Sequence, residues 1–168
     1  MNNKMHIQKR AGLLAFSFYL LVLFSSCGNK VIVDEERSFQ NEVWNRFTPE
    51  AFIVEIDNVD DYYNIDLTLS IDTTHYSERI FPMTVNLFSP NGERRMFYYD
   101  LVLKQNGRWR GEQDGKFRVI TERIRSYFSF NTTGSHRLEI GQASSKYDLL
   151  GPASLSVYIE RTKLDYDM

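Results

Sequence analysis

Cysteine is almost absent from this sequence of 168 residues, in which Cys27 is the only one. A chain with one thiol cannot close an internal disulfide, and it cannot supply the several thiolates of a structural zinc site. The folded part must therefore be held together by apolar burial. The hydrophobic content of 42% is enough for one core, and we expect one compact domain.

Histidine is also scarce, and His6, His75 and His136 do not form a metal-binding pattern such as HExxH. We interpret His75 as a solvated loop residue and His136 as a surface or capping residue at the entrance of a strand. The acidic turn over residues 57–61 lacks the ligand pattern of an EF-hand loop. The sequence therefore predicts neither a metal site nor a bound cofactor.

The sequence patterns of hydrolytic enzymes are missing as well. The chain contains no GxSxG elbow and no second cysteine for a Cys/His pair. Paired carboxylates for glycoside chemistry stay open, because their separation is set in space rather than along the chain. Nothing selects one pair over another, so we expect a protein that is not an enzyme and identify no small-molecule substrate.

An excess of positive charge is the next feature that is missing. The formal net charge is −2, and every Asp and Glu follows Cys27, so loss of the N-terminal segment leaves a more acidic chain. Proteins that bind nucleic acid nonspecifically usually carry a basic domain or a dense basic stripe. We therefore expect no nucleic-acid partner.

The one long apolar run lies near the N-terminus. Lys9 and Arg10 precede an uncharged run over residues 11–24, which is shorter than the roughly 20 residues that span a bilayer as a helix. Ser25-Ser26-Cys27 then looks like a bacterial lipobox, although Phe24 stands where that pattern usually has leucine. We predict a signal peptide over residues 1–26 and lipid attachment at Cys27.

The residues after Cys27 predict how the protein is held and where it goes. Two or more acyl chains on Cys27 give stable membrane anchoring, and residues 27–33 form the lipidated cysteine and its tether. Gly28-Asn29-Lys30 has neither an acidic cluster of the kind that sends some bacterial lipoproteins to the cell surface nor, at Gly28, the acidic side chain that retains lipoproteins at the inner membrane. We therefore expect the domain in the outer membrane, facing the periplasm.

Most of the remaining chain alternates between apolar and polar residues with a period of two, as half-buried strands do. The alternation predicts strands at 52–56, 65–71, 83–88, 95–103, 116–120, 123–130, 136–140 and 155–159. This pattern indicates an all-β fold, an antiparallel two-sheet β-sandwich of immunoglobulin-like or jelly-roll type, over residues 34–163. Residues 31–33 are an edge strand or part of the tether, and residues 164–168 form a flexible tail. The expected core residues include Leu67, Leu69, Val85, Phe128, Ile140 and Val157.

Two surface features of this domain are candidates for function. The aromatic runs 96–99 and 127–130 lie beside arginines, and they could form a partner-binding face. In the second run the alternation turns Ile124, Phe128 and Phe130 toward the core, and Arg123, Arg125 and Tyr127 toward solvent. In addition, Asp72-Thr73-Thr74 resembles a three-residue acceptor for bacterial protein O-glycosylation, with Thr73 as the modified residue.

Several short motifs together resemble a known family. Ser38-Phe39 followed by Trp44, the turn 89–92, Gly107-Arg-Trp-Arg-Gly111, the stretch 130–143 and Leu150-Gly151 are similar, in this order and behind a lipobox, to the gliding motility lipoprotein GldH family of Bacteroidetes. The resemblance implies an accessory envelope lipoprotein, required for gliding in motile members and also present in bacteria that do not glide. It implies Cys27 as the lipid site and no catalytic positions.

The expected function is therefore that of a noncatalytic envelope lipoprotein. It would support assembly or stability of the gliding or secretion apparatus, through contacts with other envelope proteins. The alternative is a lipid-anchored module that binds a glycan or a peptide, which an exposed row of aromatic residues beside a groove would favour.

Overall fold

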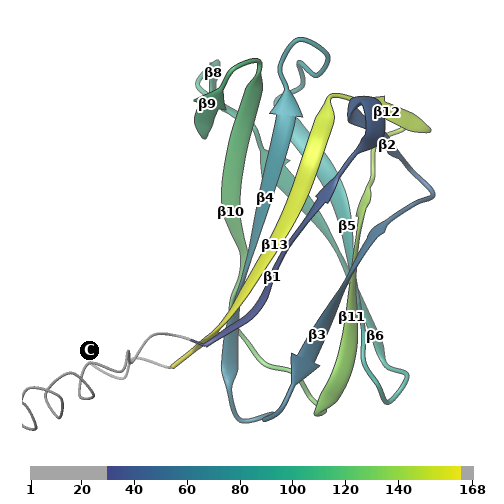
Figure 1. Cartoon of the computed structure of the whole chain (residues 1–168), viewed down its shortest axis with the longest axis vertical. Coiled ribbons are helices and arrows are strands. Elements are labelled where there is room, and N and C mark those ends of the chain that lie inside the picture. Colours follow the sequence, from purple (N-terminus) through teal and green to yellow (C-terminus); the bar gives the residue numbers. More distant parts are fainter. Residues whose placement is uncertain (1–29, 164–168) are drawn as a thin grey trace, which may run out of the picture.

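The computed structural model describes residues 30–163 of the chain (Figure 1). The predicted signal peptide, Cys27 and the tail at 164–168 lie outside the described residues and stay predictions. Within the described range the fold is all-β, and the only helical segment is a single 3-10 turn, η1, at Gln40–Glu42. No helix in this range is long and apolar enough to cross a membrane.

Two antiparallel sheets form the body of the molecule, as predicted for a β-sandwich. The five-stranded sheet has the order β1 (Val31–Ser38), β13 (Pro152–Thr162), β4 (Tyr62–Asp72), β10 (Phe117–Phe128) and β9 (Glu112–Asp114). The four-stranded sheet has the order β3 (Glu50–Ile56), β11 (Gly134–Gln142), β5 (Ile80–Phe88) and β6 (Arg94–Val102). Two short ribbons complete the fold, β2 (Val43–Asn45) with β12 (Asp148–Leu150) and β7 (Lys104–Gln105) with β8 (Arg108–Trp109).

The inward-facing residues of both sheets form one core. Leu67, Leu69, Val85, Ile140 and Val157 are fully buried, as predicted. Phe128 packs against this core but is only partly buried, so the expectation that it lies inside was wrong. Its pairing with β4 follows a register shift, and the preceding residue has a positive φ, which together turn the strand away from the core at this point.

The segment that we divided into two strands, 116–120 and 123–130, is one continuous strand, β10. Its pairing with β4 runs through Thr121 and Glu122 without interruption. Register shifts follow at Arg123/Arg125 and at Arg125/Phe128. The sequence suggested a break because polar residues interrupt the apolar alternation, whereas the backbone ladder continues regardless of side chain.

The two ends of the sandwich differ. At the upper end in Figure 1 lie η1, the β2–β12 ribbon, the β8 and β9 segments and the loop that follows β4. At the lower end lie the described ends of the chain and the connections β3–β4 and β5–β6. We call the upper end the loop end. Of the two readings of Val31–Val33, the structure shows the edge strand, since β1 begins at Val31.

Candidate functional site

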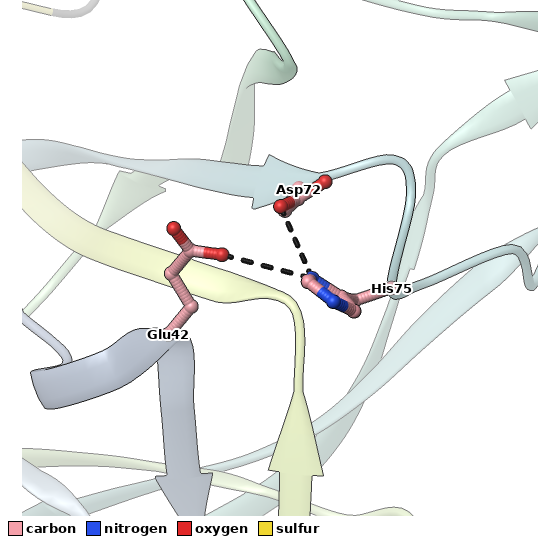
Figure 2. Close-up of side chains that lie close together, drawn as sticks. All are labelled: Glu42, Asp72 and His75. Carbon is pink, nitrogen blue, oxygen red and sulfur yellow. Dashed lines mark hydrogen bonds and ion pairs between the residues drawn. The ribbon is translucent and has the colours of Figure 1, made fainter.

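The loop end brings together four ionisable residues that are far apart in the sequence, and we call them the Asp72 cluster. Asp72 ends β4, His75 lies in the following turn, Glu42 ends η1, and Lys116 directly precedes β10. His75 Nδ1 lies 3.1 Å from Asp72 Oδ2 and 3.8 Å from Glu42 Oε2 (Figure 2). Lys116 Nζ lies 2.6 Å from Glu42 Oε1 and 2.9 Å from Asp72 Oδ2.

Asp72 takes its position from the turn that it organises. Its Oδ1 accepts hydrogen bonds from the backbone N–H of Thr74 at 2.8 Å and from the Thr74 hydroxyl at 2.7 Å, which is an Asx-turn. Its own N–H donates to the Gly151 carbonyl, and its carbonyl accepts from Tyr76 N–H. The side chain of Asp72 is fully buried, so its Oδ1 depends on Thr74 and its Oδ2 on Lys116 and His75.

The electrostatics of the cluster keep its central groups charged. Burial alone would raise the pKa of Asp72, but hydrogen bonds from the Lys116 ammonium and from Thr74 outweigh it and hold that pKa well below its ordinary value. Hydrogen bonds to Glu42 and Asp72 raise the pKa of Lys116. A carboxylate and an ammonium held in these states form an ion pair, and neither suits proton transfer near neutral pH.

The Asp72 cluster has the residue types of a cation site but already contains a cation of its own. Glu42, Asp72 and His75 place one ligand atom each within 4.8 Å of one another, which is the arrangement of metal-binding residues. However, the Lys116 ammonium bonds to both carboxylates. We therefore interpret the cluster as an ion-pair network that joins η1, the end of β4 and the start of β10.

A groove of about 460 Å³ opens beside His75, between the β4–β5 loop and the β11–β12 loop. Residues 75–80 and 144–146 supply most of its walls, and its charged side chains include Glu78, Arg79 and Lys146. Tyr76 closes it from the core side, where burial raises the pKa of this phenol to about 12 and its hydroxyl donates to the Ile80 carbonyl. The groove therefore has charged side chains of both signs beside apolar surface, and two loops line it.

Two exposed aromatic side chains pack on each other at the loop end, and one of them follows a groove residue in the sequence. Phe47 is 70% exposed and Tyr147, which follows the groove residue Lys146, is 66% exposed. Their ring centroids are 5.6 Å apart. The sequence pattern does not point to this pair, because Phe47 and Tyr147 lie about 100 positions apart and only the β2–β12 ribbon brings them together.

The outer faces of the two sheets differ in chemistry. Across the four-stranded sheet, the register aligns Ile53, Arg137, Phe88 and Arg94 in one row, and both arginines lie over the Phe88 ring. Exposed Met96 and Tyr98 extend this apolar and cationic surface along β6. Across the five-stranded sheet the corresponding row is polar: Glu36, Ser156, Thr68 and Thr121.

The two aromatic runs are therefore only partly exposed. In the first, Met96 and Tyr98 face solvent whereas Phe97 and Tyr99 pack against the core. In the second, Ile124 and Phe130 are buried and Arg123 and Tyr127 are exposed, as predicted. Arg125 is a correction, because the register shift turns it inward and its guanidinium lies 3.6 Å from the centroid of the Phe97 ring.

His136 is not a surface residue, so that interpretation was wrong. It is fully buried, its Nε2 lies 2.8 Å from the Thr132 carbonyl oxygen, and its ring packs edge-on against Phe130. Its Nδ1 has no hydrogen-bond partner within the described range. The signal was present in the sequence, since His136 shares the inward parity of Leu138 and Ile140.

His75 is an exposed loop residue, as expected, but it has the ion-pair partners described above. Thr73 is half-buried, and its hydroxyl donates to the Lys116 carbonyl at 3.2 Å. In the acidic turn at 57–61, Asp57 pairs with Lys30 and Arg161, and Asp61 pairs with Arg161. That turn therefore fastens both described ends of the chain to the sandwich.

Comparisons with known proteins give two matches. The model of a family described as GldH lipoprotein matches residues 31–155, a range that includes the Asp72 cluster and the groove. The protein named gliding motility lipoprotein GldH homolog, from Christiangramia forsetii (strain DSM 17595 / CGMCC 1.15422 / KT0803), is 29% identical over 140 residues, which are 79% of this chain and 83% of that relative. Both matches agree with the resemblance drawn from the motifs.

Proposed function

This chain belongs to the GldH lipoprotein family, and on that premise we propose that it supports assembly or stability of the gliding or secretion apparatus through contacts with other envelope proteins. Its relatives are gliding-motility lipoproteins, which are not a known enzyme family. A noncatalytic role is consistent with the Asp72 cluster, whose ion pair holds Asp72 and Lys116 in their charged states.

The observation that carries the proposal is the outer face of the four-stranded sheet. Ile53, Met96 and Tyr98 are exposed by 49%, 52% and 72% on this face, beside Arg137 and Arg94. Protein interfaces are enriched in aromatic residues, methionine and arginine. Glu139 on the same face is neutralised by an ion pair with Arg137. The polar outer face of the other sheet lacks this composition, so we assign partner binding to the four-stranded sheet.

The lipid anchor and the location of the domain are part of the same proposal. Cys27 carries the lipid, and the domain faces the periplasm from the outer membrane. Support comes from Lys30, whose carbonyl accepts from Arg161 N–H and whose ammonium pairs with Asp57, so the folded domain begins three positions after Cys27. Protease added to intact cells tests this location, and the domain should be protected as a periplasmic marker is. Digestion of the domain while the marker survives would show that the domain faces outward.

Affinity purification of the tagged lipoprotein from its own envelope tests the binding face. Ile53→Asp should remove the partners that co-purify with the wild type and reduce gliding or secretion in a deletion strain. Thr121→Asp, which adds the same charge to the outer face of the other sheet, is the control and should retain both. Equal loss with the two variants, or no loss with Ile53→Asp, would contradict the assignment of the face.

The groove supports a second candidate function, a module that binds a glycan or peptide. The exposed Phe47–Tyr147 pair lies next to its residue Lys146, and aromatic faces beside polar groups suit sugars and peptides. Tyr147→Ala and Phe47→Ala should then abolish retention on peptidoglycan or on immobilised peptide arrays, whereas Ile53→Asp should not. Loss of retention with Ile53→Asp alone would count against the groove.

A further inference from the structure

β6 forms one edge of the four-stranded sheet, and its charged residues are Arg94, Arg95 and Asp100. An edge strand presents unpaired N–H and C=O groups, and proteins protect such edges with bulges, short strands, proline, charge or a covering segment. β6 has 9 residues, contains no proline, and pairs with β5 along its whole length without a register shift. Within residues 30–163 no strand pairs with its outer edge.

The other three sheet edges are protected. β1 carries the acidic run Asp34-Glu35-Glu36 and a register shift near its start. β3 lies in contact with β1 at the corner of the sandwich. β9 is only 3 residues long, and beyond Val119 the edge is formed by β10, which is interrupted by register shifts at Arg123/Arg125 and Arg125/Phe128. Against this pattern β6 is the edge most open to strand addition, up to Val102, whose carbonyl accepts a hydrogen bond from Arg110.

We propose that the β6 edge binds the β6 edge of a second copy of this chain, antiparallel and centred on Phe97. In this register Arg94 of each copy lies opposite Asp100 of the other, and Met96 lies opposite Tyr98. All four side chains are on the outer face of the sheet, as directly opposite residues of an antiparallel pair must be. The two-fold symmetry gives each of these pairs twice.

The charges at the two ends of β6 are suited to this pairing. The neighbour of Asp100 on β5 is Pro82, and no described residue forms an ion pair or hydrogen bond with its carboxylate. Arg94 lies opposite Phe88 and donates to the neutral Asn86 side chain at 2.8 Å. Among residues 30–163, therefore, neither Arg94 nor Asp100 has an ion-pair partner, and the second copy supplies one to each.

Neighbouring registers do not give this match. A shift by one residue would set outer-face side chains opposite inner-face ones, which antiparallel pairing forbids. Centring on Tyr98 would place Met96 opposite Asp100 and Arg94 opposite Val102, without an ion pair. The register centred on Phe97 also covers Met96 and Tyr98, which are large, exposed side chains, and places the thioether next to the aromatic ring.

This inference concerns the edge of the sheet and does not rest on the proposed envelope role. The pairing uses Arg94, Met96 and Tyr98 of the outer face, whereas Ile53 and Arg137, on β3 and β11, stay uncovered and remain available to another partner. The experiments below use the full-length lipoprotein in its own envelope, and they do not involve Ile53.

Cysteine cross-linking tests the proximity of the two edges. The only natural cysteine is Cys27, so Met96→Cys/Tyr98→Cys adds thiols at two positions that face each other across the pair. Opposite residues have Cα atoms about 4.5–5.5 Å apart, which is within disulfide range. Mild oxidation should yield a species of twice the monomer mass. Ile53→Cys/Glu55→Cys, with the same spacing on β3, is the control and should stay monomeric.

Charge reversal tests the register. Arg94→Asp and Asp100→Arg should each lower the cross-linked fraction roughly threefold or more, because like charges then lie opposite each other at two places. The combination Arg94→Asp/Asp100→Arg should restore it. Both sites are exposed, and unchanged thermal unfolding of each variant excludes a folding defect. The proposal is overturned by a double reversal that stays as low as the single ones, by cross-linking only to a different protein, or by no cross-link.

Discussion

Lys116 Nζ lies 2.9 Å from Asp72 Oδ2 and so joins the residue before β10 to the buried end of β4. Glu42 accepts from the same ammonium, which adds η1 to the connection. Three segments that are distant in the sequence therefore meet at one lysine. The side chain of Asp72 is fully buried, whereas that of Lys116 is 48% exposed. Loss of Lys116 should therefore cost more stability through the unpaired carboxylate than loss of Asp72 would through the unpaired ammonium.

We expect Lys116→Met to lower the urea midpoint of unfolding at pH 7, because it leaves the buried Asp72 carboxylate without its counter-charge. The folded-state pKa of Asp72 is lowered, so its stabilisation is complete above about pH 4 and is lost as the pH falls through the folded-state value. The folded-state pKa of Lys116 is raised, so its stabilisation is present below about pH 10 and is lost above that.

The difference between wild type and Lys116→Met should therefore be constant from about pH 5 to 9 and shrink on acidification below about pH 4. Lys146→Met, which removes another lysine of the loop end, is the control and should leave the midpoint unchanged. A difference that is as large at pH 3 as at pH 7 would contradict the role of this ion pair.

We expect Leu67→Ala to cost about 2–5 kcal/mol of the free energy of unfolding, because Leu67 is fully buried between the two sheets. The matched control is Leu150→Ala, at a leucine that is 52% exposed, and it should change that free energy by less than about 0.5 kcal/mol. Denaturant titration of both variants measures the two values. Similar costs would show that the sandwich core is not where the structure places it.

Cys27→Ala should leave an unprocessed precursor or a protein that is released from the envelope fraction, since stable anchoring needs the acyl chains. Fractionation and electrophoretic mobility measure the two outcomes. Asn29→Ala, two positions away, is the control and should be processed and retained as the wild type is. Equal retention and mobility for Cys27→Ala and wild type would refute lipid attachment.

The native protein should carry a glycan on Thr73. Because the Thr73 hydroxyl donates to the Lys116 carbonyl, a glycan on its oxygen would remove that hydrogen bond, and we expect the β4–β5 loop to open more easily in the modified form. Intact-mass spectrometry of the protein from its own envelope measures the modification, with Thr73→Val as the unmodified reference. A wild-type mass without an added glycan would contradict this prediction.

The alternation of apolar residues predicted the central strands well, because those strands have one face in the core. Leu67 and Leu69 in β4 and Ile140 in β11 are examples of residues whose burial follows from their parity alone. The full length of β1 was not predicted. Its acidic run resembles a loop, and only the ladder with β13 makes it a strand. Edge strands have less need of an apolar face, so their pattern is weaker.

The Asp72 cluster could not be predicted at all. Glu42 and Lys116 are separated from Asp72 along the chain in both directions, and single charged residues in polar segments look like solvated surface. The burial of His136 could have been predicted, since its parity matches that of Leu138. The turn of Arg125 toward Phe97 could not, because a register shift leaves no mark in the apolar pattern.

The hydrogen bond from Arg161 N–H to the Lys30 carbonyl fixes Lys30 to the sandwich, so only a short link separates the folded domain from Cys27. With lipid on Cys27, the three steps to Lys30 span at most about 11 Å. β4 alone, with 11 residues, extends about 36 Å. Copies held so closely search for one another over a surface rather than through a volume, and their effective concentration rises accordingly. A strand-to-strand contact that is too weak to persist in dilute solution can then be populated in the envelope.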